Sequence, residues 1–321
     1  MERTLPHSRG LVKRNCSLNY GLASNCTFSG NTAAGGYHSG GYGDGICNYG
    51  GSPTVTNCAF TSNTATGGYY SGGSGGGICN WSGSPTVTNC TFSGNAAAGG
   101  YYSGDGSGGG MHNDSVLPTV TNCIFWGNNA SLGAEIYEDG GTLTFSHCDI
   151  KGSGGSGALW DHDLGVDGGG NIGGDPRFVA PATPVGPDGL WRTSDDGLRL
   201  RSDSPCIGAA DPAAAPETDI LGLPRGSAPD IGAYEFPSGG YCTLTYNAGA
   251  GGSISGATPQ TVDYGADGSE VTAVPDVGYR FVRWSDGVMT ASRTDTNVTA
   301  DITVTAVFAP LAAVKDWALY E

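Results

Sequence analysis

An F-x-x-N motif recurs at a nearly constant interval and constrains the fold more than any other feature of the chain. Its phenylalanines are Phe28, Phe60, Phe92 and Phe125, separated by 32, 32 and 33 residues. The flanking residues repeat almost unchanged, as in SPTVTNCAFTSN and SPTVTNCTFSGN. A fixed period in this range is typical of stacked-repeat architectures, in which each unit packs only against its neighbours.

One repeat unit predicts a coil of three short strands. Val55 and Cys58 are three residues apart, so a single straight strand cannot place both on the same face. A bend at Asn57 resolves this, because asparagine tolerates the left-handed conformation that tight bends require. Cys58 and Phe60 then point inward together, and a third strand around Ile78 closes a triangular coil. The pattern therefore predicts an all-β parallel helix.

Stacking of such coils places equivalent side chains in columns about 4.8 Å apart, the spacing of adjacent strands. We expect the corner asparagines to form an amide ladder in which each side chain donates to the next. The cysteines and phenylalanines would form core columns, and a further corner is expected at Asn63, beyond which Ala65 turns inward. The predicted columns are Asn25, Asn57, Asn89 and Asn122; Cys26, Cys58, Cys90 and Cys123; and Phe28, Phe60, Phe92 and Phe125.

Three glycine- and tyrosine-rich segments are predicted to leave the scaffold as loops. The interval from Cys123 to Cys148 is 25 residues rather than 32 or 33, and the missing part corresponds to GGYHSGGYGDG, GGYYSGGSGGG and GGYYSGDGSGGG in earlier repeats. An aromatic flank formed by stacked tyrosines can bind sugars or partner proteins. The simpler interpretation, which we favour, is that the tyrosines pack over the glycines and cover the coil. The residues concerned are Tyr37, Tyr69 and Tyr101, expected to stack, with Tyr70 and Tyr102 beside them.

The repeats are poor in charge, and the chain as a whole is acidic. Of 321 residues, 58 are glycine and 14% are charged, and the formal net charge is −16. No lysine or arginine occurs between Asn15 and Ile150. Because a polyanion is repelled by nucleic acid and by anionic lipid, we expect neither as a partner and no membrane insertion. Glycans, or proteins on host or neighbouring-cell surfaces, are the partners we expect.

The composition favours an extracellular or cell-surface location. Repeats rich in Gly, Ser, Thr and Asn with so little charge are typical of such proteins, although the N-terminal residues lack the apolar run of a signal peptide. We interpret the chain as a fragment of a longer protein. The residues NCSL at 15–18 already copy the N-C-x-apolar core, and the sequence stops after LAAVKDWALYE.

The motifs resemble those of known bacterial surface proteins. The F-x-x-N units, alternating with G-G-x-apolar units such as Gly76-Gly77-Ile78, resemble the repeats of chlamydial-type polymorphic outer-membrane proteins. More broadly, the array resembles right-handed parallel β-helices of the pectate-lyase-like superfamily. The motifs GGGNIGGDPRF, LRLRSDSPCIGAADP and DIGAYEF, between about 168 and 236, resemble the terminal coils of choice-of-anchor Q surface proteins. The resemblance implies a right-handed parallel β-helix.

A second module follows the array. The stretch from Tyr241 to Ala309, with its GYRFVRWSDG core, resembles the divergent internalin B-repeat family of small β-grasp-like modules, in which Trp284 is expected to be a core residue. The predicted organisation is a repeat array over 1–150, with coils at about 25–56, 57–88, 89–121 and 122–147; terminal coils and a cap over 151–237; a linker at 238–240; a β module over 241–310; and the start of a further segment at 311–321.

Catalysis is the alternative that the superfamily resemblance raises, because many of its members cleave acidic polysaccharides. Lyases of this fold use a basic side chain and bound Ca²⁺, whereas hydrolases need carboxylates on adjacent strands. Before Glu135 the array offers only Asp44, Asp105 and Asp114, and Asp44 aligns with glycines in later coils, so no acidic column is expected. We expect a non-enzymatic structural or adhesive segment. A polysaccharide lyase or hydrolase, or a carbohydrate-binding module, is the alternative.

Two clusters are candidates for metal binding. Asp161, Asp163 and Asp167, in WDHDLGVDGGGN, could bind Ca²⁺ through oxygen ligands, but a solvated loop is the interpretation we favour, and no other cofactor is expected. Cys47, Cys79 and His112 form a second column, whose first and third members would lie about 9.6 Å apart, too far for one zinc ion. These cysteines should point outward, because their neighbours Ile46 and Ile78 point inward. They then either form a disulfide or stay reduced.

Overall fold

The structure is a computed structural model, which describes residues 16–17, 21–102, 104–237, 240–264, 266–298 and 300–311. It divides into two compact units, Met1–Phe236 and Pro237–Glu321. Residues 238 and 239 of the expected linker, residues 312–321 of the expected further segment and most of the first 20 residues lie outside the described residues.

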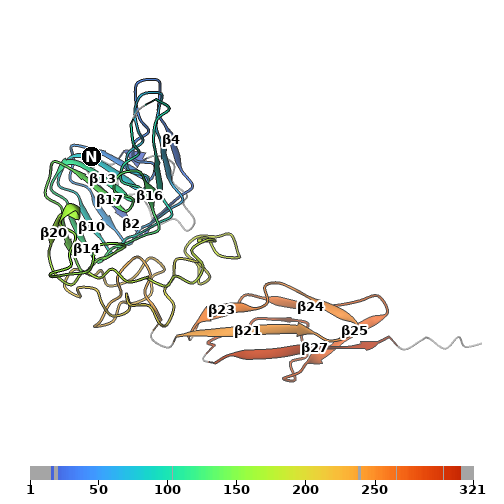
Figure 1. Ribbon diagram of the computed structural model, residues 1–321. Coiled ribbons are helices and arrows are strands. Elements are labelled where there is room, and N and C mark those ends of the chain that lie inside the picture. The colour runs from blue at the N-terminus through green and yellow to red at the C-terminus, as the bar shows by residue number, and fades with distance from the viewer. Residues whose placement is uncertain are drawn as a thin grey trace, which may run out of the picture. The chain divides into compact units, whose positions relative to one another are not determined.

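In unit 1, short parallel strands stack coil upon coil into four sheets (Figure 1). Sheet I contains β1 (Cys16–Ser17), β5 (Ile46–Tyr49), β9 (Ile78–Gly83), β13 (Met111–Val116) and β17 (Ile136–Asp139). Sheet II contains β2 (Leu22–Ser24), β6 (Thr54–Thr56), β10 (Thr86–Thr88), β14 (Thr119–Thr121), β18 (Thr144–Ser146) and β20 (Val166–Asp167). Sheet III contains β3 (Thr27–Ser29), β7 (Ala59–Thr61), β11 (Thr91–Ser93), β15 (Ile124–Trp126) and β19 (Asp149–Ile150). Sheet IV contains β4 (Thr32–Ala34), β8 (Thr64–Thr66), β12 (Ala96–Ala98) and β16 (Asn129–Ala130).

Successive coils align residue for residue, so identical side chains stand directly above one another. Phe60 of β7 pairs with Phe28 on one side and Phe92 on the other. The stacked rings of Phe28, Phe60, Phe92 and Phe125 have centroids 4.7, 4.6 and 4.5 Å apart and are parallel to within 3°. Each ring is almost fully buried and contributes about 2–3 kcal/mol of burial free energy. The parallel β-helix predicted from the period is confirmed.

Three of the four sheets enclose the hydrophobic core. Val55 of sheet II, Phe60 of sheet III and Ile78 of sheet I belong to one buried cluster, together with Cys58 at the corner. Of the strands of sheet IV, β4, β8 and β12 lead outward into the excursions, whereas no excursion follows β16. The three expected strands therefore form the walls of the triangular core, and the fourth strand begins a projection from it.

The bends at the predicted corners are present, but the amide ladder lies in a different column. Asn25, Asn57, Asn89 and Asn122 have φ values of 51°, 49°, 48° and 56°, in the left-handed region. Among the described residues, only one hydrogen bond between their side chains is present, from Asn122 to Asn89 at 3.1 Å. The continuous ladder is made instead by Asn31, Asn63, Asn95 and Asn128, with successive side-chain hydrogen bonds of 2.7, 2.8 and 2.8 Å.

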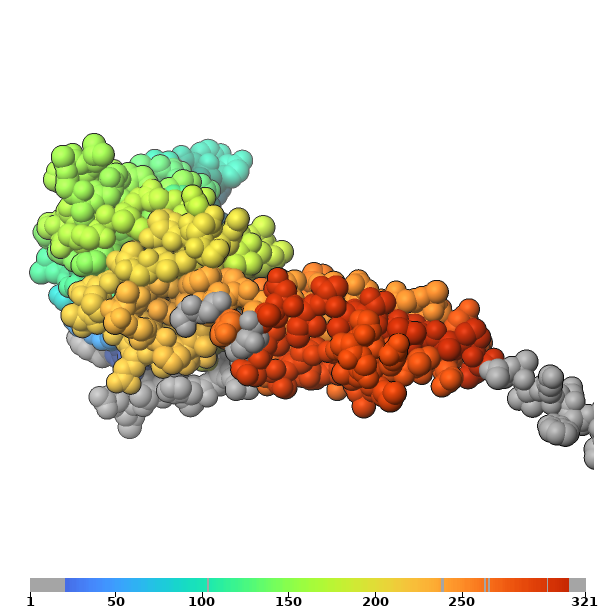
Figure 2. Space-filling view, turned by 90° about the horizontal axis from the view of Figure 1, so that it is seen from below, coloured from blue at the N-terminus to red at the C-terminus, as the bar shows by residue number. Residues whose placement is uncertain are grey.

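The chain forms one more partial coil after β19, and then leaves the helical path. This coil contains the short 3₁₀ helix η1 (His162–Leu164), and β20 pairs with β18. The segment over residues 178–236, which we call the flank segment, was expected to form terminal coils. It instead folds against the outer face of sheet III, and Figure 2 shows it in yellow on one face of the unit. Its Ile231, Ala233 and Tyr234 are buried together with Ala59 and Ile124 of sheet III.

The flank segment forms hydrogen bonds with three of the corner asparagines, Asn57, Asn89 and Asn122. Asn57 donates to the main-chain oxygen of Thr218 at 2.6 Å, and Asn89 donates to that of Asp230 at 3.1 Å. The main-chain N–H of Asp211 donates to the Asn122 side-chain oxygen at 2.7 Å. The side chains of three of the four corner asparagines thus have main-chain partners in the flank segment.

Unit 2 is a small all-β module with two sheets. The four-stranded sheet has the order β23 (Gln260–Asp263), β21 (Tyr241–Ala248), β27 (Ile302–Pro310) and β25 (Tyr279–Trp284). The other contains β22 (Gly252–Ser255), β24 (Val271–Pro275) and β26 (Ser292–Arg293). Strands β21 and β27 pair in parallel at the centre, as in a β-grasp, although the described residues of this unit contain no helix. Trp284 is fully buried, and the Arg293 guanidinium lies 5.2 Å from its ring centroid.

Candidate functional site

The excursions of three coils form one narrow projection, visible beyond β4 in Figure 1. We call it the fin; it comprises residues 32–42, 64–74, 96–102 and 104–107. In each coil the chain runs outward through a strand of sheet IV and returns beside it. The N–H groups of Gly67 on the outgoing side and Gly73 on the returning side both donate to the oxygen of Ala98, at 3.0 and 2.8 Å. The two sides of the fin are thus joined to the same carbonyl of the next coil.

Glycine is required where the two sides meet. A Cβ atom at Gly41 would overlap the main-chain oxygen of Ala33, and one at Gly73 would overlap that of Ala65. The same holds for Gly106 and the oxygen of Ala97. The glycine-rich repeats therefore build a thin, hydrogen-bonded wall rather than a flexible linker.

Aromatic rings form two files at the tip of the fin. In the first file, the ring of Tyr69 is stacked on Tyr37 and Tyr101, with centroids 4.7 and 5.5 Å away. In the second file, Tyr70 is stacked between His38 and Tyr102, at 5.6 and 6.1 Å. The two files meet edge to face; the Tyr69 and Tyr70 planes, for example, differ by 82°. The stacking expected for these tyrosines is present, and His38 is a further member of the second file.

The favoured interpretation of these tyrosines, that they cover the coil, is wrong. Tyr37, Tyr70, Tyr101 and Tyr102 are all exposed, and Tyr69 is only partly covered. The physical reason is the length of the hairpins: their glycine walls already close against each other, so the rings at the tip have no coil surface beneath them to cover. A hydrogen bond with Tyr102 raises the pKa of Tyr69 and ties the two files together.

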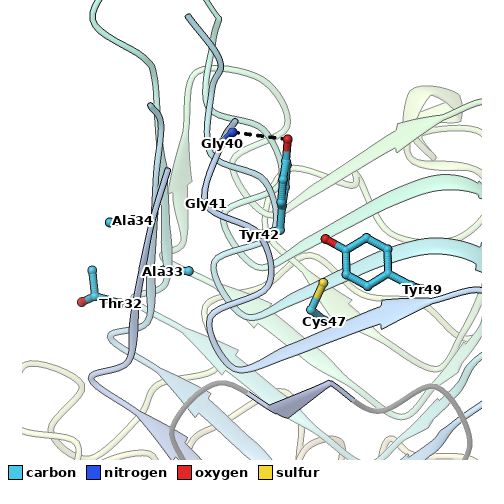
Figure 3. A pocket seen from close by; sticks show the side chains of 8 residues that line it. All are labelled: Thr32, Ala33, Ala34, Gly40, Gly41, Tyr42, Cys47 and Tyr49. Carbon is cyan, nitrogen blue, oxygen red and sulfur yellow. Dashed lines mark hydrogen bonds between the residues drawn. The ribbon is translucent and has the colours of Figure 1, made fainter. Parts of the chain in front are cut away.

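A groove lies where the fin leaves the scaffold in the first described coil. It has a volume of about 490 Å³ and is lined by Thr32, Ala33, Ala34, Gly40, Gly41, Tyr42, Cys47 and Tyr49. Figure 3 shows the outgoing strand on one side and Tyr42, Cys47 and Tyr49 on the other. The Gly40 N–H donates to the Tyr42 hydroxyl at 3.3 Å, which fixes that ring against the returning chain.

The outward column of Cys47, Cys79 and His112 is buried rather than solvent-exposed. The returning side of the fin lies over it, because a Cβ at Gly43 would be 2.7 Å from the Cys47 Cβ and one at Gly75 would be 2.7 Å from the Cys79 Cβ. Burial lowers the pKa of His112, whose Nδ1 lies 3.0 Å from the Ser107 hydroxyl. No disulfide bond joins any of the cysteines from Cys26 to Cys242.

Sheet I carries an acidic pair that the sequence interpretation missed. Asp114 of β13 and Asp139 of β17 are in register on adjacent parallel strands, although no acidic column was expected. Trp81 is the next member of the same column, and Tyr49 follows it. The sequence contained the information needed to predict this pair. Tyr137 continues the column of Cys47, Cys79 and His112, and this alignment places Asp114 opposite Asp139. Asp139 follows Glu135 in the chain and is therefore not among the carboxylates from which no acidic column was expected.

Two of the candidate calcium ligands, Asp161 and Asp167, accept hydrogen bonds within the loop. Asp161 accepts from the N–H of Asp163 at 3.1 Å, as the N-terminal cap of η1. Asp167 accepts from the Gly157 and Gly169 N–H groups at 2.8 and 2.9 Å, which lowers its pKa to about 2. Among the described residues, no group of three His, Cys, Asp or Glu side chains is placed to hold a metal ion.

Two family models match the chain, one in each unit. Residues 10–169 match the model of the right-handed β-helix region. Residues 242–312 match the model of the divergent InlB B-repeat domain. No curated protein matches the chain, and no solved structure does. Unit 1 is thus a right-handed parallel β-helix, whereas the resemblance to pectate lyases, polymorphic outer-membrane proteins and choice-of-anchor Q proteins stays a prediction.

Domains of these two kinds are typical of surface or adhesive proteins. The β-helix match ends at residue 169, shortly before the flank segment. Within the described residues, no helix is both long and apolar enough to cross a membrane. The fin is therefore the most distinctive chemical feature of the β-helix, because it gathers aromatic side chains from three coils at one exposed edge.

Proposed function

We propose that this chain is a non-enzymatic structural and adhesive segment of a bacterial secreted or cell-surface protein. The observation that carries the proposal is the fin tip, where six rings from three coils stand in two exposed files. Aromatic side chains offer a large contact area for little loss of conformational entropy. A surface built this way suits contact with a glycan or a protein on another surface.

The architecture supports such a role physically. Each of the three coils that has an excursion adds one hairpin to the fin, so the number of contacts grows with the number of such coils. Weak contacts repeated at a fixed spacing produce strong overall binding when several engage at once. The in-register hydrogen bonds hold the hairpins in place, so binding does not have to order them first.

The experiment applies the labelled full chain to panels of immobilised glycans and to intact bacterial and host cells. The proposal expects retention on at least one surface, and weaker retention when Tyr69 and Tyr101 are both replaced by alanine. Tyr264, an exposed tyrosine of unit 2, gives the matched control Tyr264→Ala. Retention on none of the surfaces would overturn the adhesive role. Protease accessibility of the protein on intact producing cells tests the location separately.

A polysaccharide hydrolase is a second candidate, favoured by the aligned Asp114 and Asp139. Paired carboxylates on adjacent strands are the arrangement that glycoside hydrolysis requires. Trp81 lies in register beside Asp114, where a sugar ring could stack. Incubation with acidic and neutral polysaccharides, scored for new reducing ends, separates the two functions. Turnover that is lost in Asp114→Asn would replace the adhesive proposal with this one.

A further inference from the structure

We infer that the open end of the tyrosine stack, formed by Tyr101 and Tyr102, is a stacking site for the apolar face of a neutral hexopyranose within a glycan. The inference rests on the proposed function of the fin and specifies which rings bind and what kind of ligand. It follows from the places where the two files end, from the exposure of their members, and from the charge around them.

The files end because the next coil lacks an excursion. In the coil that contains β15, the chain passes from β16 through Leu132, which bridges directly to Ser107, without forming a hairpin. Among the described residues, no ring therefore follows Tyr101 or Tyr102. Each has a neighbour on one face, since Tyr69 is stacked on Tyr101 and Tyr70 on Tyr102. Among the described residues, no ring is stacked on the other face of either tyrosine.

The exposed fractions of the tyrosine side chains agree with their positions in the two files. Tyr101 is 78% exposed and Tyr102 is 64% exposed, against 45% for Tyr70, which lies between two rings. A sugar stacks on the flat face of an aromatic ring, where its axial C–H groups meet the negative π-system. The inner members, Tyr69 and Tyr70, are each stacked with a ring on both sides. Only the end rings offer a full face to a ligand.

The two end rings are held in a fixed relation. Their centroids are 4.8 Å apart and their planes differ by 71°, so they form a notch rather than one flat surface. The Tyr101 N–H donates to the oxygen of Gly68 at 3.1 Å, and the Tyr102 N–H donates to that of Tyr69 at 3.0 Å. Because the backbone is already bound to the preceding coil, little entropy is lost when a ligand binds.

The charge around the fin determines the kind of glycan. The chain has no Lys or Arg between Asn15 and Ile150, and Asp105 lies in the same hairpin as the two rings. A net charge of −16 repels acidic polysaccharides, so a neutral sugar is favoured. A protein partner is less suited to this site, since stable protein interfaces engage about 20–30 residues on each side. The end of a thin fin does not provide that many.

The test measures binding of the full chain to neutral oligosaccharides of hexoses, with cellohexaose and mannohexaose as probes and polygalacturonate as the acidic comparison. Calorimetry gives the Kd, and saturation-transfer NMR shows which ring protons of the sugar touch the protein. The variants are Tyr101→Ala with Tyr102→Ala, Tyr101→Phe with Tyr102→Phe, and Tyr264→Ala. Circular dichroism of each variant verifies that the fold is retained.

We expect at least one neutral probe to bind, with its axial C–H protons saturated. The double alanine variant should weaken binding at least ~10-fold, because two stacking faces are lost. The double phenylalanine variant and Tyr264→Ala should keep binding within about threefold, since both retain the end faces. Unchanged binding by the double alanine variant, or a preference for polygalacturonate, would overturn the inference.

The outcomes also separate this inference from the proposed function. If the chain adheres to cells but binds no neutral probe, the stacking site is wrong and the adhesive role stands. If the chain adheres to no surface and binds no probe, both fail. If a probe binds but the double alanine variant retains it, the ligand class is right and the assigned site is wrong.

Discussion

The side-chain amide of Asn95 donates a 2.8 Å hydrogen bond to the side-chain oxygen of Asn128, one coil further along the β-helix. The same amide donates to the main-chain oxygen of Phe60 at 2.9 Å, and the Asn95 oxygen accepts from Asn63 at 2.8 Å. All the polar atoms of this buried side chain are therefore used. The ladder ends at Glu135, which accepts from Asn128.

We predict that Asn95→Ala lowers the free energy of unfolding of the β-helix by about 2–4 kcal/mol, because it leaves buried partners on two neighbouring coils without hydrogen bonds. Urea unfolding followed by circular dichroism measures this. The comparison is Asn89→Gly, which keeps the left-handed corner but removes the amide that binds Asp230. That variant should cost about 1 kcal/mol and loosen the flank segment. Equal costs for the two changes would show that the ladder has no special role.

We predict that Gly73→Ala disrupts the fin while leaving the core columns intact. A Cβ at this position would overlap the oxygen of Ala65, so the two sides of the hairpin must separate. Near-ultraviolet circular dichroism should show loss of the tyrosine signal, and limited proteolysis should cut the hairpins. Gly226→Ala is the control, because a Cβ there meets no atom within 4 Å. Identical behaviour of the two variants would contradict the close packing of the fin.

We predict that the stability of the folded chain decreases as the pH rises from about 4 to 7, because folding raises the pKa of buried carboxyl groups. Burial raises the pKa of Asp149 to about 7, and that of Asp196 to about 7. A carboxyl group whose pKa is raised by folding favours the folded state fully below its unfolded pKa, near 4, and this contribution is lost as the pH rises through 7. The melting temperature should therefore decrease across this window.

The variant Asp149→Asn should flatten the pH dependence, since its amide cannot ionise but can still accept from Cys206. Asp163→Asn, at an exposed position, serves as the control and should leave the slope unchanged. Thermal melts at half-unit steps from pH 4.5 to 8 provide the measurement. A melting temperature that increases towards pH 8 in the unmodified chain would contradict the prediction.

We predict that the flank segment loses structure locally when its buried ion pair is broken. Arg225 donates to Glu235 at 2.8 Å, and its side chain is almost fully buried. Replacing Arg225 with alanine leaves Glu235 buried without its counterion, which costs about 3–5 kcal/mol. We expect the flank segment to detach from sheet III and expose Cys206 to thiol reagents.

The matched control for this change is Arg177→Ala. Arg177 pairs with Asp203 at 2.8 Å, but both side chains are about half exposed, so its removal should cost at most about 1 kcal/mol. The rate of Cys206 labelling in the two variants, set against the unmodified chain, is the readout. Protection of Cys206 in Arg225→Ala would show that the apolar contacts and the hydrogen bonds of the corner asparagines hold the segment without this ion pair.

The β-helix was predictable because its information is local and repeated. The 32-residue period implies the register, and the residues between Asn57 and Phe60 are enough to predict a bend followed by an inward strand. Each coil packs against a near copy of itself, so no long-range contact has to be inferred beyond the next repeat. The stacked phenylalanines follow directly from this.

The flank segment was not predictable in the same way. Its motifs DIGAYEF and LRLRSDSPCIGAADP do not repeat, and its partners in the β-helix lie 57 to 168 residues away, from the pair of Cys206 and Asp149 to the pair of Arg225 and Asn57. Nothing in the local pattern distinguishes a further coil from a segment that lies along the outside. The pairing of Asp114 with Asp139 is intermediate, because it could be derived by extending the column alignment into the shorter coil.

The sequence by itself determined the stacked coils, their core columns and the corners, since those depend on spacing and on backbone preferences that each repeat carries. Only the tertiary structure decided which asparagine column forms the ladder, where residues 178–236 pack, and that the fin tyrosines are exposed. These outcomes depend on competition between partners for the same hydrogen bonds and apolar surface. Such competition is resolved only when distant segments meet in space.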